Sequence, residues 1–387
     1  MNSGVLFVTE DHSRKNTGIT AVVNFLSAIC QTSASDQSAI IIVAVGAGSI
    51  APADGIELIE VPADLCGFNW GWSAKFKKVI KQSIKNHKIG VLHLHGLWKA
   101  APWVAQKVAH SLGVSTILSV HGMVEPWAWY GQGKLRTLKK NLYWHLLAKP
   151  VFSRVSVLHA ITPLEQRHLS DLLPDKRIEL IPNAIDLSEI DSQLSFSDRV
   201  LQKRILYVGR IHPKKGVDLL ISAFISANLG SQWRLLIAGP EEDQNYLQLL
   251  KADAKKSELC DQIEFSGPIY EVEKYTCMMN SWVVVAPSYS EVVGMVNLES
   301  AGCYTPTLTS PQTGLLNWEE GGGILVEPDR RLLSDALKTV AQWSVPERIQ
   351  RGTRSRKFVE QLYSLTSVRA KWMSLYEELA KMTKLPE

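Results

Sequence analysis

Short runs of β-branched or aliphatic residues alternate with longer stretches of helical periodicity over most of the 387 residues. An alternation of this kind predicts an α/β fold, in which a parallel sheet carries helices on both of its faces. In the first half, we expect strands at 5–9, 39–45, 56–61, 91–95, 115–120, 155–160 and 178–181, and helices at 20–31, 73–86, 100–111, 134–147 and 164–172.

The alternation pauses at 183–203, a polar stretch after Pro182 that we predict to be a linker. Beyond it, the pattern predicts two doubly wound, Rossmann-like domains in tandem, and two or three helices finish the chain after Val345. Ligands of open α/β sheets bind outside the carboxyl ends of the strands, so we expect a ligand in a cleft between the domains. The expected strands are 204–208, 234–238, 262–265, 282–287, 306–309 and 323–326, and the expected helices are 217–228, 245–256, 272–280, 296–303 and 331–342.

Composition excludes several classes of protein. The formal net charge of +4 is too small to indicate nucleic-acid binding, so no nucleic-acid partner is expected. The five cysteines show neither CxxC nor Cys/His spacing, which argues against a zinc site or a disulfide framework and fits a reducing cytoplasm. The amino terminus does not read as a signal peptide, and no window approaches the ~18–20 apolar residues of a spanning helix. We therefore expect a cytoplasmic protein whose contact with a membrane is at most peripheral.

The segment 207–216, YVGRIHPKKG, carries the most informative pattern. A predicted strand ends at Val208, and Arg210 and Lys215 follow on a short loop before the next helix. Two cations beside a helix amino terminus are typical of a diphosphate site, because free backbone N–H groups and the helix dipole also favour anions. On spacing alone, two solvated loop charges remain the alternative.

A second segment, 288–300, has the sequence SYSEVVGMVNLES and follows another predicted strand. Its Glu291 and Glu299 are separated by seven residues, so a loop carboxylate and a helix carboxylate can face one ligand. Gly294 lies between them, allows close approach of the backbone and is expected to open the helix. Taken alone, this spacing is weak evidence.

Together, the two segments and several further motifs resemble the retaining, nucleotide-sugar-dependent glycosyltransferases of family 4 (glycosyl transferases group 1), which have the GT-B fold. The resemblance covers almost the whole chain. Its motifs are HLHGLW (93–98), SVHGMVEPWAW (119–129), HAITPLE (159–165), IPNAID (181–186), VGRIHPKKGVDLLISAF (208–224), IAGP (237–240), FSGPI (265–269) and the glutamate segment.

The resemblance implies a role for each matching residue. Arg210 and Lys215 would hold the donor diphosphate, which would make a metal ion unnecessary, and no other cofactor is implied. Glu299 would bind the ribose hydroxyls, and Glu291 would contact the donor sugar near the reacting carbon. Backbone N–H groups around Gly294, Met295 and Val296 would contact sugar and phosphate, and the base would lie near Gly239, Pro240 and Pro268.

The amino-terminal half departs from the family in one loop and matches it at one histidine. The Gly-Gly pair expected near the donor phosphate is reduced to Gly18 in the sequence Asn-Thr-Gly. His121 matches the family histidine that faces the donor sugar. We interpret His93 and His95, which alternate on one strand, as structural. In the second half, Val292 and Val293 replace the usual Pro or Phe after the first glutamate.

Two stretches without acidic residues are rich in lysine and arginine. The stretch 72–88 contains six lysines, with apolar residues on the opposite flank of the expected helix, and 134–149 contains further Lys and Arg beside aromatic residues. Amphipathic cationic helices can lie on anionic membranes. We therefore expect the anionic inner face of the membrane as a further partner. The alternative is that these residues form an outer helix face in contact with solvent alone.

The resemblance implies a division into an acceptor-binding domain at 1–190, a nucleotide-sugar-binding domain at 191–365 and a terminal helix at 366–387 that packs back on the first domain. The expected reaction moves a hexosyl unit from a nucleoside diphosphate sugar to a glycan or lipid-linked glycan, in lipopolysaccharide, O-antigen or exopolysaccharide biosynthesis. The alternatives are a sugar-nucleotide epimerase and a non-catalytic module that binds nucleotide sugar or glycan.

Overall fold

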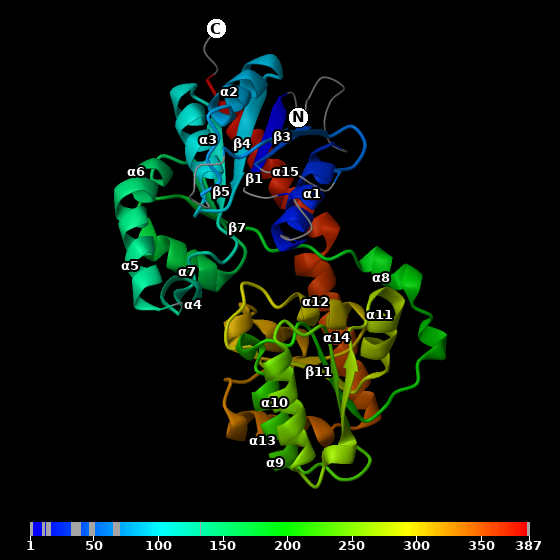
Figure 1. Cartoon of the computed structure of the whole chain (residues 1–387). Helices are drawn as coiled ribbons and strands as arrows, with labels where there is room; N and C mark the ends of the chain where they lie inside the picture. The colour runs from blue at the N-terminus through cyan, green and yellow to red at the C-terminus, as the bar shows by residue number, and fades with distance from the viewer. Residues whose placement is uncertain are drawn as a thin grey trace. The chain divides into compact units, whose positions relative to one another are not determined.

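The computed structural model describes residues 3–9, 12, 17–31, 40–45, 51–64, 70–131 and 133–384. The chain divides into two compact units, of which unit 1 comprises Met1–Asn183 with Arg369–Glu387 and unit 2 comprises Ala184–Val368 (Figure 1). We expected the divisions after residues 190 and 365, whereas the units separate after 183 and 368.

Unit 1 contains a seven-stranded sheet in the order β3-β2-β1-β4-β5-β6-β7, in which every pair of neighbours is parallel. The central strands β1 and β4 are buried along their whole length, as expected for a sheet covered on both faces. The strands are β1 Gly4–Thr9, β2 Ile40–Val45, β3 Glu57–Val61, β4 Ile89–His95, β5 Ser115–Ser119, β6 Val157–Ala160 and β7 Ile178–Leu180. Of the expected strand 39–45, residue 39 lies outside the described residues.

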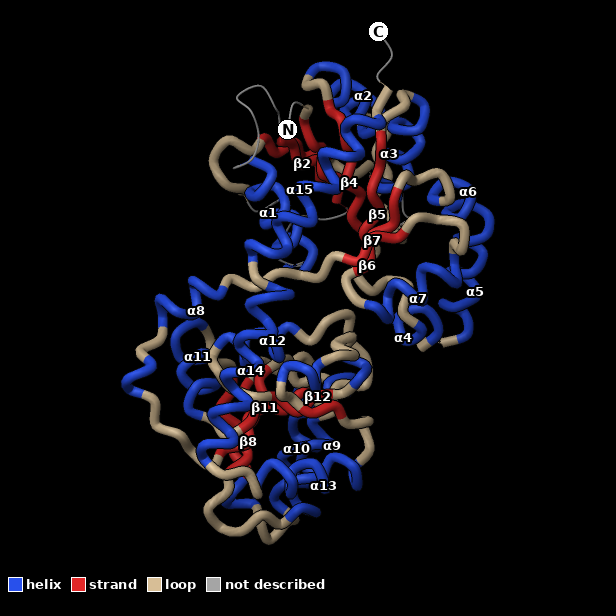
Figure 2. Tube along the Cα trace, turned by 180° about the vertical axis from the view of Figure 1, so that it is seen from behind, coloured by secondary structure: helices blue, strands red, loops and turns tan. Residues whose placement is uncertain are grey.

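Helices cover both faces of this sheet. The helices α1 and α15 lie together on one face, and α2 and α3 lie on the other, as both ribbon views show (Figures 1 and 2). Among the described residues, no helix is long and apolar enough to cross a membrane. The helices of this unit are α1 Thr17–Gln31, α2 Phe76–Asn86, α3 Ala100–Ser111, α4 Pro126–Tyr130, α5 Lys134–Tyr143, α6 Lys149–Phe152, α7 Pro163–Leu172 and, from Arg369 onward, α15 Leu365–Met382.

The end of the chain forms hydrogen bonds to the sheet of unit 1, as expected for a last helix that packs back on the first domain. The Tyr376 hydroxyl lies 2.8 Å from His93 Nδ1, and the backbone N–H of Ser115 donates to Thr383 Oγ1 at 2.9 Å. The N–H of Lys384 donates to the carbonyl of Gly113 at 3.1 Å. These contacts join residues between 268 and 283 positions apart and hold the end of the chain against unit 1.

Unit 2 contains a six-stranded parallel sheet in the order β10-β9-β8-β11-β12-β13. The helices α9, α10 and α13 group on one side of it, and α11, α12 and α14 group on the other (Figures 1 and 2). Its strands are β8 Arg204–Val208, β9 Arg234–Ala238, β10 Ile263–Gly267, β11 Val283–Ala286, β12 Thr307–Thr309 and β13 Ile324–Leu325. Its helices are α8 Leu187–Gln193, α9 Val217–Ala227, α10 Gln244–Lys255, α11 Glu271–Asn280, α12 Met295–Gly302, α13 Arg330–Ala341 and α14 Val345–Tyr363.

The predicted linker at 183–203 begins where the two units divide, but it contains a helix that the sequence did not predict. The stretch contains α8, which begins where the Asp186 side chain accepts hydrogen bonds from the backbone N–H groups of Ser188 and Glu189. Leu187 and Ile190 are buried against α12, where a Cβ at position 302 would lie 2.6 Å from the end of the Ile190 side chain. Two apolar residues and one capping aspartate make this helix, which is too weak a pattern to separate from a polar loop.

Candidate functional site

All of the residues expected to bind the donor in the second half follow the carboxyl ends of neighbouring parallel strands. Arg210 and Lys215 follow β8, Gly239 and Pro240 follow β9, and Pro268 follows β10. The segment from Glu291 to Glu299 begins in the loop after β11 and continues along α12. Because these strands are parallel neighbours, one edge of the unit 2 sheet carries the whole set.

Glycines at the first position of two of these loops allow the loops to touch. The N–H of Gly209 donates to the carbonyl of Ala238, and the N–H of Gly239 donates to the carbonyl of Gly267. Both Gly209 and Gly239 have positive φ, of 156° and 152°. A Cβ on Gly239 would lie 1.8 Å from the carbonyl oxygen of Gly209, so no larger residue fits there.

The substitution Gly239→Ala is therefore expected to destabilise unit 2 by about 3 kcal/mol or more, because strained backbone and a backbone clash act together. Gly267→Ala is the matched control, since its φ is 79° but a Cβ there meets nothing within 4 Å. The control should cost only the backbone strain of about 1–2 kcal/mol. Urea unfolding of the two variants measures the difference, and equal losses would contradict the assigned close approach.

The loop between β8 and α9 is held by a short 3-10 turn, Pro213–Lys215. The His212 side chain caps this turn by accepting from the N–H of Lys214 at 3.1 Å. Gly216 follows in the left-handed region with φ 69°, where a Cβ would lie 2.3 Å from the carbonyl oxygen of Pro287. This glycine lets the loop that carries Lys215 lie directly against the end of β11.

The consequence is a direct pairing of two residues that the sequence places 76 positions apart. Lys215 Nζ lies 2.7 Å from Glu291 Oε1, and the two side chains are only 15% and 14% exposed. Ser288 Oγ donates to the same carboxylate oxygen at 2.7 Å, and the backbone N–H of Glu291 donates to Gln312. A largely buried, hydrogen-bonded ion pair fixes both groups at the edge of the sheet.

Arg210 is more exposed, and it pairs with a residue that sequence reasoning missed. Its guanidinium forms an ion pair with Glu242, which also lies 3.9 Å from His212 Nε2. Partial burial, with the neighbouring charges of Lys215 and Arg210, lowers the pKa of Lys214, another residue that was missed. Three cations thus stand together on this loop, as the KK pair in the sequence could have suggested.

Glu299 and the start of α12 form the other side of the site. Lys274 of α11 pairs with Glu299, with 3.0 Å between Nζ and Oε1. Gly294 caps α12, and its carbonyl accepts from the Asn297 side chain, which a Cβ at 294 would displace. The helix begins at Met295 and Val296 follows, so both residues lie in its first turn. Two of the three expected backbone donors are already used, because the N–H of Gly294 donates to the carbonyl of Thr313 and the N–H of Met295 donates to the carbonyl of Val293. Neither Lys274 nor Asn297 stood out in the sequence.

The remaining candidates, Gly18 and His121, belong to unit 1. Gly18 lies exposed in the first turn of α1, where a Cβ would meet nothing within 4 Å, so packing within the described residues does not require a glycine. Asn16, which belongs to the same loop match, lies outside the described residues. His121 follows β5 with a φ of +50°, rare for a residue other than glycine, at the carboxyl edge of its own sheet.

Glu165 of α7 holds the turn at His121. Its carboxylate accepts from the N–H of Gly122 at 2.5 Å and from that of Ile161 at 2.8 Å. Burial raises the pKa of this carboxyl, and the two backbone donors oppose the shift. The Thr162 side chain caps α7 by accepting a hydrogen bond from the N–H of Glu165. Sequence reasoning did not single out Glu165, but the Thr-x-x-Glu pattern, which is typical of a helix start, could have indicated it.

A hydrogen-bonded chain of neutral side chains runs through the sheet behind His121. Because a carbonyl can only accept, His159 Nε2 donates to Ile181 at 2.8 Å, which leaves His159 Nδ1 to accept from Ser119 Oγ at 2.7 Å. Ser119 then accepts from His93 Nε2 at 2.7 Å, and His93 Nδ1 accepts from the Tyr376 hydroxyl. His93 is thus a structural link between β4, β5, β6 and α15.

His95 lies beside this hydrogen-bonded chain, with its ring centroid 4.1 Å from that of His93, and it contacts His121. Its Nδ1 lies 2.8 Å from His121 Nε2, and the two rings are stacked. Burial lowers the pKa of His121 to about 3 and that of His159 to about 4, and moves the pKa values of His93 and His95 well below the ordinary range. Within the described part of the chain, no group of three His, Cys, Asp or Glu side chains is arranged to hold a metal ion.

Two family models match this chain, one in each half. Residues 32–189 match glycosyltransferase family 4, and residues 196–351 match the glycosyl transferases group 1. The chain therefore belongs to the glycosyltransferases of the group 1 and family 4 type.

Curated relatives are distant and match only part of their own length. The GDP-mannose:cellobiosyl-diphosphopolyprenol alpha-mannosyltransferase of Xanthomonas campestris is 25% identical over 256 residues, which cover 65% of this chain and 64% of that protein. A subunit of the phosphatidylinositol N-acetylglucosaminyltransferase of Schizosaccharomyces pombe is 22% identical over 313 residues, which cover 80% of this chain and 66% of that protein. For these two relatives and two further ones, the matched part of the chain covers between 48% and 66% of the relative's own length.

Solved structures share the fold over almost the whole chain. Sucrose-phosphate synthase from Thermosynechococcus elongatus matches with a TM-score of 0.75 at 18% identity, covering 99% of this chain and 100% of that one. Anabaena HepE in complex with UDP-glucose matches with a TM-score of 0.68 at 15% identity, covering 97% and 99%. The two Rossmann-like units confirm the expected GT-B fold.

Proposed function

We propose that this protein transfers a hexosyl unit from a nucleoside diphosphate sugar to an acceptor hydroxyl, with retention of configuration and without a metal ion. The observation that carries the proposal is the Lys215–Glu291 pair at 2.7 Å, set beside Arg210 and the start of α12 on one sheet edge. This edge combines fixed positive charge for a diphosphate with a carboxylate for a sugar hydroxyl.

The proposed chemistry is a front-face displacement. The bond between the anomeric carbon and the β-phosphate oxygen breaks while the acceptor oxygen bonds to the same face of that carbon. The acceptor proton passes to the departing phosphate oxygen, so no protein base is needed. Arg210 and Lys215 offset the negative charge that develops on the nucleoside diphosphate, which is the charge a divalent cation would otherwise neutralise.

The other site residues would orient the donor. Glu299, held by Lys274, would accept hydrogen bonds from the ribose hydroxyls. The N–H of Val296 in the first turn of α12 would meet sugar and phosphate, whereas the N–H groups of Gly294 and Met295 would first have to leave the carbonyls of Thr313 and Val293. The base would lie near Gly239, Pro240 and Pro268. The HepE complex with UDP-glucose supports a nucleotide sugar as the donor class.

Unit 1 would bind the acceptor, and the resemblance assigns Gly18 and His121 of this unit to the donor. The Xanthomonas relative is named for a polyprenol-linked diphosphate acceptor, which supports a glycan or lipid-linked glycan as acceptor here. We place the reaction in the cytoplasm, in the synthesis of a cell-surface polysaccharide such as lipopolysaccharide, O-antigen or exopolysaccharide.

Thermal unfolding with UDP, GDP, ADP and their sugars tests the donor class. A ligand that binds only the native state at about one hundred times its Kd adds about 2.7 kcal/mol, or roughly 5–10 °C in Tm. We expect one base to give this shift equally with and without EDTA. Release of nucleoside diphosphate should then require an acceptor and should also survive EDTA.

Each alternative predicts a different result. A binding module would show the Tm shift but no acceptor-dependent release of nucleotide. An epimerase would convert the sugar nucleotide without any acceptor. Loss of turnover in EDTA with recovery on added cation would contradict the metal-independent mechanism.

A further inference from the structure

The charge of this protein is distributed very unevenly along the chain. Residues 65–164 contain fourteen Lys or Arg but only one acidic residue, Glu125, and Glu125 is buried. The rest of the chain is acidic, with 28 Lys or Arg against 37 Asp or Glu. A net charge near zero for the whole molecule therefore conceals one strongly basic segment.

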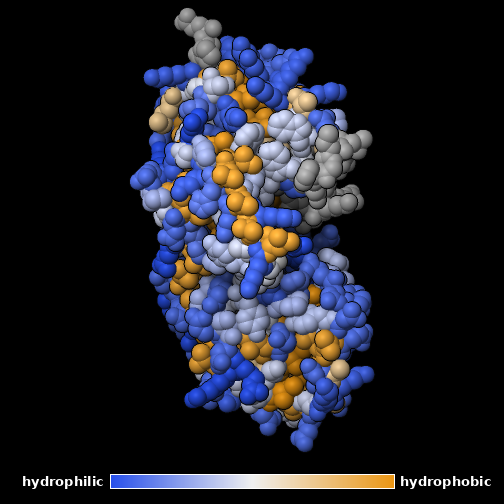
Figure 3. All heavy atoms as spheres, turned by 60° about the vertical axis from the view of Figure 1, so that its left-hand side comes forward, coloured by the Kyte–Doolittle hydropathy of each residue, from blue (hydrophilic) through white to orange (hydrophobic). Residues whose placement is uncertain are grey.

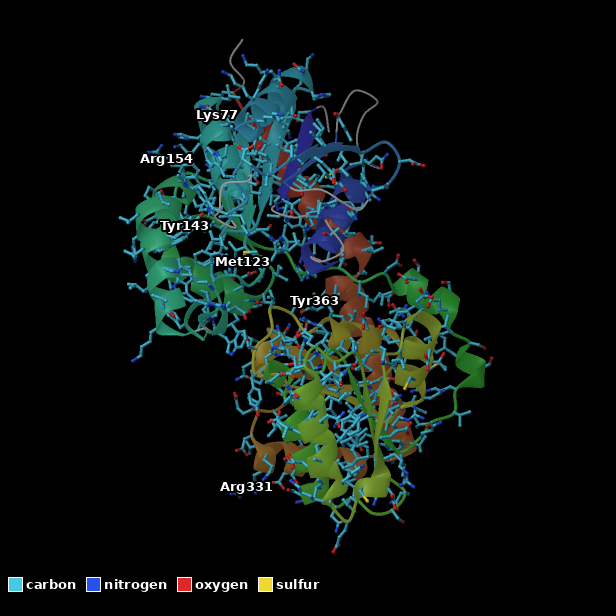
Figure 4. The ribbon with its side chains drawn as sticks, viewed as in Figure 1. Lys77, Met123, Tyr143, Arg154, Arg331 and Tyr363 are labelled. Atoms are coloured by element: carbon cyan, nitrogen blue, oxygen red, sulfur yellow. The ribbon has the colours of Figure 1, made fainter. Side chains whose placement is uncertain are left out.

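The basic side chains of this segment lie mainly on a group of helices in unit 1 that contact one another, which we name the basic layer. Helix α2 packs on α3, α3 packs on α6, and a π-helical segment, Trp144–Ala148, joins α6 to α5. Twelve of the fourteen basic side chains are exposed, and Figure 4 shows Lys77 of α2 and Arg154 after α6 at the outer edge of this layer. The exposed set is Lys75, Lys77, Lys78, Lys81, Lys85, Lys88, Lys107, Lys134, Arg136, Lys139, Lys149 and Arg154.

Helix α2 supplies charge only. Its apolar flank, which the sequence suggested could meet a membrane, is packed inside the protein, because Phe76, Ile80 and Ile84 are buried in the core of unit 1. This helix cannot insert apolar side chains into a bilayer without unfolding. Its lysines remain on the outside.

Helix α5 has the opposite arrangement. Leu135, Leu138, Leu142 and Leu146 form a stripe along α5 and the π-helical segment, and they are 67%, 56%, 52% and 69% exposed. No residue of α5 is buried. Figure 3 brings this side of unit 1 forward and shows a row of apolar side chains among hydrophilic ones. We name these four residues the leucine stripe.

The opposite side of the same helix is already occupied. Trp129 Nε1 donates to Asn141 at 2.7 Å, the Tyr143 hydroxyl donates to the carbonyl of Leu97 at 3.2 Å, and Trp144 is buried. The stripe therefore cannot turn inward without breaking these contacts. Beside it, α4 contacts α5 and exposes Trp127 and Tyr130, two residue types that favour the membrane interface.

We infer that the leucine stripe inserts into the interfacial region of an anionic lipid bilayer, with the basic layer around it bound to lipid headgroups. An exposed apolar stripe rimmed by Lys and Arg fits that surface in both polarity and charge. A second copy of the chain fits poorly, because a two-fold contact through α5 would bring Lys134, Arg136 and Lys139 against the same cations of the partner.

Cosedimentation of the full chain with vesicles tests this inference. The experiment needs no transferase assay, so its result is independent of the proposed reaction. We expect binding to vesicles of phosphatidylcholine with phosphatidylglycerol, weakening in high salt, and little binding to phosphatidylcholine alone. Each cation near an anionic surface increases the binding constant about fivefold. The triple variant Lys77→Gln, Lys78→Gln, Lys81→Gln should therefore bind about a hundredfold more weakly.

The double variant Leu138→Glu, Leu142→Glu separates insertion from charge attraction. This variant should bind vesicles at least about tenfold more weakly even at low salt. It removes the apolar carbons that would enter the bilayer, and it adds negative charges that the anionic lipids repel. Leu249→Glu, at a leucine 63% exposed in unit 2, is the matched control and should bind like wild type. Equal binding by the double variant and the control would overturn the inference. So would a dimer in sedimentation that this double variant dissociates while vesicle binding stays unchanged.

Discussion

The substitution Lys215→Ala is expected to lower kcat/KM for glycosyl transfer by about a hundredfold to a thousandfold, or about 2.7–4 kcal/mol of transition-state stabilisation. The reason is electrostatic, since the ammonium would meet charge that develops only as the nucleoside diphosphate departs. Steady-state kinetics with a saturating acceptor measures the loss. Lys215→Arg keeps the charge and should recover part of the activity.

Two further variants separate this role from a structural one. Removing Lys215 leaves the Glu291 carboxylate unpaired and only 14% exposed, which itself destabilises the fold. The double variant Lys215→Ala, Glu291→Gln should therefore regain stability in urea without regaining turnover. Lys256→Ala breaks an exposed ion pair with Asp253 in the same unit and should change neither quantity. Wild-type turnover by Lys215→Ala would refute the proposed diphosphate site.

Acidification from pH 7 to pH 5 is expected to destabilise unit 1 strongly. The pKa values of His121 and His159 fall to about 3 and about 4 on folding, against an unfolded value of ~6.5. Between those values the unfolded chain binds more protons than the folded one, so stability falls as pH falls. Each group contributes about 2 kcal/mol of loss by pH 5, and His93 and His95 shift in the same direction.

Urea unfolding at a series of pH values measures this dependence. The variant His121→Asn is the sharpest probe, because asparagine tolerates the left-handed conformation at that position and cannot titrate in this range. The stability of this variant should fall less steeply with falling pH, because unfolding of the variant takes up about one proton fewer than unfolding of the wild type. Glu165, whose pKa is raised by burial, acts in the opposite sense and only moderates the effect.

The expected secondary structure was largely correct because periodicity and β-branched runs are local properties. Strands such as β8 and helices such as α3 begin and end at the expected residues. The failures have local causes as well. Helix α8 was missed because two apolar residues do not make a period, and the helix at 134–147 extends to 152 because the π-helical segment carries it past the last periodic residue.

The site was predicted in its positions but not in its contacts. The sequence indicated Arg210, Lys215, Glu291 and Glu299, and the structure places all four at one edge of the unit 2 sheet. It did not indicate the partners Glu242 and Lys274, which lie on other elements. A lone carboxylate or lysine on a helix has no distinguishing pattern, so only proximity identifies it.

By itself, the sequence determined which segments become strands and helices, and therefore that parallel strand ends would present their loops at one edge of each sheet. The tertiary structure alone decided which charges pair, which histidines lose their hydration, and that α2 buries its apolar flank while α5 exposes one. The physical reason is range. Hydrophobic periodicity acts over neighbouring residues, whereas ion pairs and burial depend on segments brought together from distant parts of the chain.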